Sequence, residues 1–134
     1  MNPESQGLHT HYTLLCDDIR FEVGNRLSLI GMFHSIATAQ LPFALIRLAV
    51  ITYWHGQGAG SSEARVVSPD RSKVIAMSNV TPVSLTAGAF THNLVVFVNV
   101  VLPAEGTYWV QILLDSAVVD EVPFVVVLQQ PDPV

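Results

Sequence analysis

The chain has 134 residues, of which 50% are hydrophobic and 13% are charged, and its formal net charge at pH 7 is −5. Ordinary soluble domains carry about 25% charged residues, so this chain has more apolar surface than a small monomer readily hides. Its six Lys and Arg residues are scattered along the sequence. Nucleic-acid binding is therefore not expected, because phosphate contacts need clustered positive charge.

The sequence also argues against a membrane span. A spanning helix needs about 20 consecutive apolar residues, whereas the longest candidate, Leu41 to Trp54, is shorter and contains Arg47. The polar start MNPESQGLHTHY lacks the layout of a signal peptide. The lone cysteine, Cys16, excludes an internal disulfide and fits a reducing compartment. We therefore expect a cytoplasmic protein.

Alternating and short apolar runs, with turn residues about every ten positions, predict an all-β fold. We expect an antiparallel β-sandwich of about eight strands, immunoglobulin-like or C2-like, with little or no helix. The predicted organisation is a flexible leader over residues 1–8, a single sandwich domain over 9–128 and a flexible tail over 129–134.

The first apolar segment, LLCDDIRFEVGNRLSLIGMF, predicts a hairpin. A two-residue turn would place polar and apolar residues opposite each other. A three-residue loop, VGN, instead pairs Glu22 with Arg26 and Phe21 with Leu27, so that the faces match. Such a loop needs one residue in the left-handed region, which Asn25 tolerates.

Six further strands are expected along the rest of the chain. They are Phe43 to Trp54, Ala64 to Val67, Lys73 to Met77, Leu94 to Leu102, Thr107 to Leu114 and Val118 to Leu128. The glycine-rich residues 55–62, HGQGAGSS, are interpreted as a mobile linker. They lack the Lys-Ser/Thr and the helix of a phosphate-binding loop. Residues 83–90 are interpreted as a loop that contains Gly88.

The strand from Thr107 to Leu114 alternates cleanly. Tyr108, Val110, Ile112 and Leu114 form a core row, and Thr107, Trp109, Gln111 and Leu113 form an outward row. An outward row of this kind, together with strands that are apolar on both faces, exceeds what one sandwich buries. Because exposed apolar patches mark interfaces, we expect a homo-oligomer or a protein partner.

Neighbouring carboxylates on the first strand offer a possible calcium site. Asp17 and Asp18, with Asp70 or Asp115, could supply the oxygen ligands that Ca²⁺ prefers. Adjacent strand residues face opposite sides, however, so one ion does not readily reach both. The interpretation we favour is a pair of ordinary strand-end carboxylates.

His9 and His11 share a face on a regular strand and could form half of a zinc site. A third ligand could come from His34, His55 or His92, although no spacing in the sequence brings these residues together. We therefore predict no metal site.

Cys16 could act as a nucleophile if a histidine lay beside it. On a continuous strand His11 would point to the other face, and the predicted hairpin places Met32 opposite the thiol. A small buried thiol is the expected role.

Four aromatic residues could form a platform for a sugar or a peptide, or could simply pack in the core or an interface. They are Tyr53, Trp54, Tyr108 and Trp109. No catalytic residue, cofactor-binding residue or cofactor is predicted, and the protein is expected not to be an enzyme.

The pattern LCDD-I-R…LSLIG-M-F, with Leu41-Pro42, the turn at Pro69-Asp70 and the ending EGTYWVQILLD…VPFVVV, resembles an uncharacterised family of short bacterial cytoplasmic proteins. The resemblance covers most of the chain and implies no activity or site residue. The ending is also similar to the last hairpin of many immunoglobulin-like or C2-like sandwiches, at the level of fold only.

Three functions follow in order of preference. The first is a non-enzymatic sandwich that acts by protein association or self-assembly. The alternative is a C2-like module that binds a small ligand, Ca²⁺ or a carbohydrate. The third, a hydrolase or metal enzyme that uses Cys16 or the histidines, has the least support.

Overall fold

The structure, a computed structural model, describes residues 6–129. This part of the chain is all β and contains no helix, so none that could cross a membrane. The eight strands are β1 (Leu8–Glu22), β2 (Arg26–Met32), β3 (Ser35–Thr38), β4 (Phe43–Val67), β5 (Val74–Met77), β6 (Thr81–Leu102), β7 (Gly106–Leu114) and β8 (Ala117–Leu128). The all-β prediction with about eight strands is confirmed.

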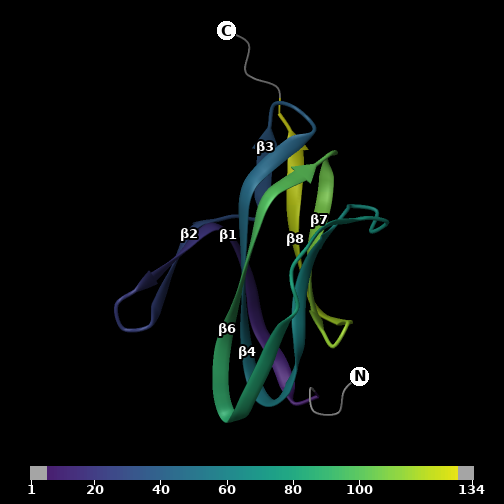
Figure 1. The fold of residues 1–134 in the computed structure, drawn as a ribbon. Helices are drawn as coiled ribbons and strands as arrows, with labels where there is room; N and C mark the ends of the chain where they lie inside the picture. The colour runs from purple at the N-terminus through teal and green to yellow at the C-terminus, as the bar shows by residue number, and fades with distance from the viewer. Residues whose placement is uncertain (1–5, 130–134) are drawn as a thin grey trace.

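One long strand, β4, belongs to both layers of the molecule (Figure 1). Its first half pairs with β1 and β6, and with β2 beyond β1 this makes the first sheet. Its last residues, 62–67, pair with β7 and β5, and β8 and β3 complete the second sheet. Only β3 and β8 pair in parallel among the described strands.

The core lies between the two sheets. Its members come from both, for example Leu48 and Val50 from the first and Val110 and Phe124 from the second. Phe124 stacks on Tyr108 with ring centroids 5.4 Å apart. The buried hydroxyl of Tyr108 donates to the carbonyl of Ala104 at 2.6 Å, which satisfies its polar end.

The predicted register of the first hairpin is confirmed. Glu22 pairs with Arg26 and Phe21 with Leu27 around a three-residue loop. Asn25 has a φ of 58°, in the left-handed region that this loop requires. Cys16 pairs with Met32, as the register predicts.

The predicted linker over residues 55–62 is wrong, because these residues continue β4. Glycine has a different use here: Gly56 has a φ of 109° and lies so close to the Gly7 carbonyl that a Cβ would be 2.0 Å from its oxygen. The glycines therefore make the corner at which β4 passes from one sheet to the other.

The predicted loop over residues 83–90 is also wrong, because it forms part of β6 and pairs with the same corner of β4. Two predicted strands, 43–54 and 64–67, are thus one strand, and β3 was not predicted. The predicted number of strands is therefore correct, but the strands themselves differ from those predicted.

The inner row of β7 is buried as predicted, but the outward row is not all exposed. Gln111 and Leu113 are buried. Gln111 accepts a hydrogen bond from Arg65 and donates one to Glu121, and these long neighbours cover it. Leu113 lies between Glu63 and Val118 of the adjoining strands.

Most of the predicted leader and tail, namely residues 1–5 and 130–134, lies outside the described part. Within that part, Leu8 opens β1 and is buried in the core.

Candidate protein-association surface

The side of the first sheet that faces away from the core carries an apolar surface. Paired residues of neighbouring strands project to the same side, so the register assembles this surface in rows. One row is Leu14, Ile51 and Leu94, from β1, β4 and β6. We call this surface the outer face. Its members are Leu14, Cys16, Met32, Ala49, Ile51, Leu94, Val96 and Val98, with the aromatic cluster described below.

Large apolar side chains on the outer face are open to solvent. Met32 is 58% exposed, Val96 48% and Val98 63%. Ala49 and Ile51 beneath them are buried by their neighbours. Scattered single exposed hydrophobic residues are ordinary, but a contiguous group across four strands is typical of an interaction site.

One ion pair lies at the border of the outer face. Nη1 of Arg47 lies 2.9 Å from Oδ1 of Asp18, and both side chains remain about half exposed. A pair in such a setting contributes about 0–1 kcal/mol. It satisfies two charges at the border of the face and adds little to stability.

Aromatic and histidine rings gather at the opposite end of the outer face. A β-bulge at His11 interrupts the β1–β4 register, so that His11 and Tyr12 both lie beside Tyr53. Tyr53 also stacks on Phe90, with ring centroids 5.4 Å apart. We call this group the aromatic cluster; its members are His9, His11, Tyr12, Tyr53, His55, Phe90 and His92.

Hydrogen bonding fixes part of the aromatic cluster. The hydroxyl of Tyr12 lies 2.9 Å from Nε2 of His92, on the far side of β4. The ring of Tyr53 packs beside both, with its centroid 4.8 Å from that of His92 and 5.1 Å from that of Tyr12. Three strands thus contribute to one packed group, and Phe90 remains 62% exposed at its margin.

The fold brings together histidines that no sequence spacing connects. His55 lies 5.7 Å from His9 and 5.5 Å from His11, measured between ring centroids. Even so, residues 6–129 contain no group of three His, Cys, Asp or Glu side chains placed to hold a metal ion. His34 follows β2, and its carbonyl accepts the amide of Val125 in β8.

The carboxylates considered for calcium are separated. Asp18 pairs with Arg47, and Asp17 lies against Gly31 of β2. Asp70 accepts hydrogen bonds from Ser68 and Ser72 within its own turn.

Asp115 is also engaged at a turn, where its Oδ1 accepts the amide of Ser61 at 2.9 Å. Each of these side chains therefore has a local structural role at a different place on the fold.

Cys16 is fully buried, as expected. Burial raises the pKa of its thiol above the ordinary value, which disfavours the reactive thiolate. The prediction that His11 faces away from Cys16 is wrong, because the bulge turns His11 to the same outer face. The thiol hydrogen bonds instead to the carbonyl of Asp18 at 3.4 Å.

The aromatic residues proposed as one platform are divided among three environments. Trp54 and Tyr108 are buried in the core. Tyr53 lies on the outer face of the first sheet and Trp109 on the outer side of the second. A joint platform of these four is excluded.

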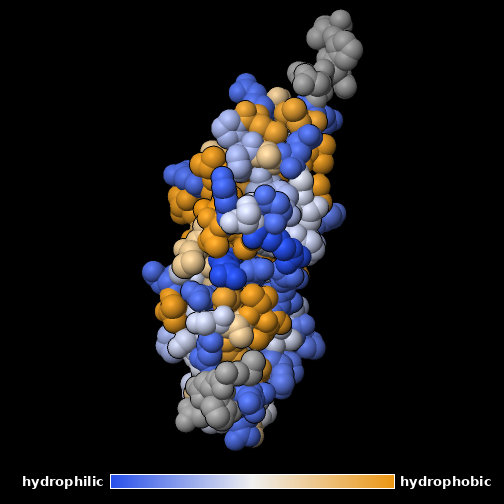
Figure 2. All heavy atoms as spheres, turned by 90° about the vertical axis from the view of Figure 1, so that its right-hand side faces the viewer, coloured by the Kyte–Doolittle hydropathy of each residue, from blue (hydrophilic) through white to orange (hydrophobic). Residues whose placement is uncertain are grey.

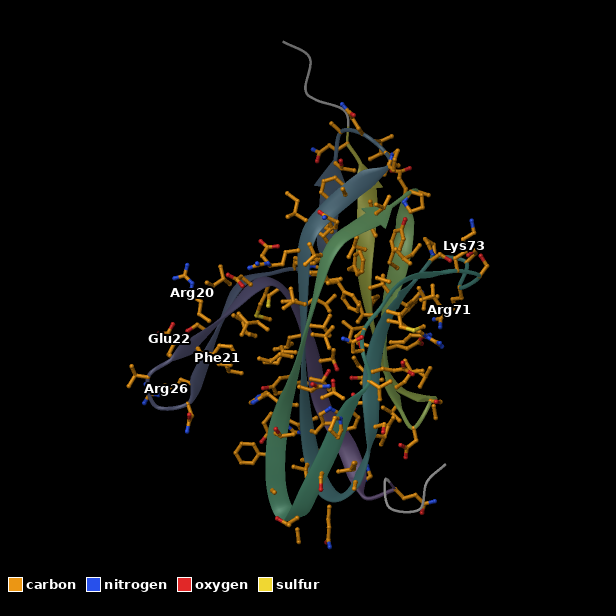
Figure 3. The ribbon with its side chains drawn as sticks, viewed as in Figure 1. Arg20, Phe21, Glu22, Arg26, Arg71 and Lys73 are labelled. Carbon is orange, nitrogen blue, oxygen red and sulfur yellow. The ribbon has the colours of Figure 1, made fainter. Side chains whose placement is uncertain are left out.

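The tips of β1 and β2 form an arm that projects from the two sheets (Figure 3). The arm carries Arg20, Phe21, Glu22 and Arg26. One side of the arm is apolar and carries Ile19, Phe21, Leu27 and Leu29. None of these four belongs to the core cluster. Phe21, on this side, is 76% exposed. The arm therefore adds a second exposed apolar area.

The outer side of the second sheet is built differently. The guanidinium of Arg71 lies 4.4 Å from the ring centre of Trp109 and donates to Glu121 at 2.6 Å. The Gln111 amide, followed by Arg71, lowers the pKa of the Glu121 carboxyl. Figure 2 shows the side of the molecule that bears the loop of Arg71. On this side, hydrophilic side chains cross the middle and separate the apolar patches.

The fold of this chain occurs in larger proteins. A family model described as "Family of unknown function (DUF6941)" matches residues 11–127. No curated protein matches. An alkylpurine DNA glycosylase from Pseudomonas fluorescens, solved with DNA containing an abasic site analogue, has a TM-score of 0.57 and 11% identity over 90% of this chain. This chain spans 30% of that protein.

A β-glucosidase from Listeria innocua, solved with glucose, has a TM-score of 0.50 and 12% identity over 90% of this chain, which spans 16% of the enzyme. An immunoglobulin-like protein from Pseudomonas aeruginosa has a TM-score of 0.43 and 11% identity, with 93% of this chain and 99% of that chain covered. At these identities the first two likenesses show the fold alone.

Proposed function

The chain belongs to DUF6941, a family of unknown function, and we propose from its own surface that it acts by binding protein through the outer face of the first sheet. The observation that carries the proposal is the contiguous apolar face, with three side chains about half exposed or more. Covering such a face with another protein removes apolar area from water, at about 25 cal/mol per Å².

The composition of the face supports a protein partner. Tyrosine, phenylalanine and methionine are enriched in protein interfaces, and the face contains Tyr12, Tyr53, Phe90 and Met32. Histidine and tyrosine add hydrogen-bonding groups at one end. The charged residues lie at its border, as in an interface with an apolar centre and a polar rim.

The proposal is of a non-enzymatic role. The dispersed carboxylates and the buried thiol of Cys16 give less support to the calcium-binding and hydrolytic alternatives. The lone cysteine also fits a cytoplasmic location, which belongs to the same proposal.

Site-specific photo-crosslinking in the producing cells tests this function. A photoreactive amino acid in place of Tyr53 probes the outer face, and one in place of Lys73 is the matched control on the opposite side. We expect protein adducts, either with a second copy or with another protein, from position 53 and few from position 73. Equal adducts from both positions, or none from position 53, would overturn the proposal.

A further inference from the structure

The longest edge strand in the described part of the chain is unpaired on one side. Among residues 6–129, β6 forms a ladder with β4 alone. In a strand, alternate residues direct their backbone N–H and C=O groups to opposite sides. Every second residue of β6 therefore offers a donor and an acceptor to the open side, which is a template for another strand.

Natural edge strands are usually protected by charged residues, proline, bulges or short length. The 22 residues of β6 contain no Asp, Glu, Lys or Arg. Two backbone features divide the strand: Gly88 has a φ of 77° and Asn99 a φ of 56°. Between them residues 89–98 run without interruption alongside β4. We call these ten residues the open edge.

The connection between β5 and β6 runs beside part of the open edge and leaves a cavity of about 340 Å³ between them. The cavity is lined by Met77, Ser78, Asn79, Thr81, Leu94, Val95, Val96 and Phe97. Both inward and outward residues of β6 line it, so the edge itself borders the cavity.

We propose that the open edge pairs with the same edge of a second copy, antiparallel and about a twofold axis at Leu94. This inference goes beyond the proposed function, because it concerns the strand edge and leaves the outer face free to bind. Pairing about Leu94 places Phe90 opposite Val98 of the second copy, by equal spacing from the centre. These two residues are 62% and 63% exposed in the single chain, and aromatic and β-branched residues form favourable cross-strand pairs.

The matched positions of Phe90 and Val98 favour a second copy as the occupant, and charge does not oppose it. The whole chain has a net charge of −5, so two copies repel wherever their carboxylates approach. The open edge has no charged side chain, so no register places like charges opposite each other. The pairing joins two first sheets into one, and their outer faces become a continuous surface twice as wide.

The test combines sedimentation with hydrogen exchange over about 1 to 100 µM protein, because self-association depends on concentration. We expect the mass to rise from one copy to two, and the amides of residues 89–98 to exchange more slowly as concentration rises. A monomeric mass throughout would overturn the inference. So would a dimer in which these amides exchange at the same rate at all concentrations.

Charge variants at the axis provide the second measurement. Leu94→Lys and Leu94→Glu each place two like charges opposite each other, so each should weaken self-association about tenfold. An equimolar mixture should restore it, because the opposed charges then attract. Ser84→Lys, on the same strand outside the open edge, is the control. If the Leu94 variants do not fold, Val98→Lys is the second variant: it places a charge opposite Phe90 of the second copy and should also weaken self-association.

The outcomes separate this inference from the proposed function. Failure of the mixture to associate, or equal weakening by Ser84→Lys, would overturn the edge pairing. Adducts from position 53 would then still support association through the outer face. Absence of those adducts would overturn the function, whatever the sedimentation result.

Discussion

The two sheets of this molecule share a strand and a core but present opposite exteriors. The second sheet ends in four-residue strands, β3 and β5, and an arginine that is paired with a glutamate covers its tryptophan. The first sheet ends on one side in a strand of 22 residues without charge, and its outer face is apolar. The exterior of the second sheet is thus covered by polar groups, whereas the exterior of the first sheet leaves apolar side chains exposed. A partner is expected on the first sheet.

The largest expected effect concerns aromatic residues on the two sides of the sheets. Phe124→Ala removes a ring packed between the sheets and should lower the free energy of unfolding by about 3–5 kcal/mol. Phe90→Ala removes an exposed ring and should change it by less than about 0.5 kcal/mol in dilute protein. Urea denaturation measures both. Equal losses would show that the outer face is buried within the single chain.

The corner that joins the sheets should be nearly as sensitive. A Cβ at Gly56 would lie 2.0 Å from the Gly7 carbonyl oxygen, at a φ of 109°. Gly56→Ala should therefore lower the free energy of unfolding by about 2–4 kcal/mol.

Gly88→Ala is the matched control for the corner, because its φ is also positive but nothing lies within 4 Å of the added methyl group. It should cost only about 1 kcal/mol. Thermal denaturation of both variants tests the difference, and similar melting temperatures would contradict it.

A smaller effect is expected on the outer side of the second sheet, where Arg71 lies over Trp109. Arg71→Ala removes the cation over Trp109 and the ion pair with Glu121, which should cost about 0.5–1 kcal/mol at pH 7. Lys73→Ala, in the same loop, should cost less.

The cost of Arg71→Ala should also depend on pH. The pKa of Glu121 is lowered in the folded protein, so its contribution is present above the ordinary carboxyl pKa and lost as the pH falls through the folded value. The difference between wild type and Arg71→Ala should therefore shrink in acid. A difference that grows in acid would contradict the assigned contacts.

The smallest effect belongs to the turn after β4. Hydrogen bonds from Ser72, then Ser68, lower the pKa of Asp70 to about 2. An unfolded aspartate titrates near about 3.9, so this contribution is present above that pH and lost between about pH 4 and 2.

Asp70→Asn should remove that part of the acid sensitivity, and Ser72→Ala should remove some of it. Melting temperatures measured across this range test both variants. An unchanged pH profile for Asp70→Asn would contradict the role of this turn.

Local patterns predicted the first hairpin well, because turn geometry and matched faces both depend on neighbouring residues. The corner of β4 was missed because glycine clusters are typical of loops, although glycine within a strand also marks a bend. The apolar surplus predicted an association surface but not its place. The aromatic cluster depends on the β-bulge at His11 and on pairings between β1, β4 and β6, which no local spacing encodes.

Because β4 supplies the central strand of one layer and part of the other, neither sheet can lose it and remain intact. Local opening therefore should be confined to the arm and the strand ends. Loss of β4 should release both layers at once, so that calorimetry shows a single transition in which the van't Hoff and calorimetric enthalpies agree.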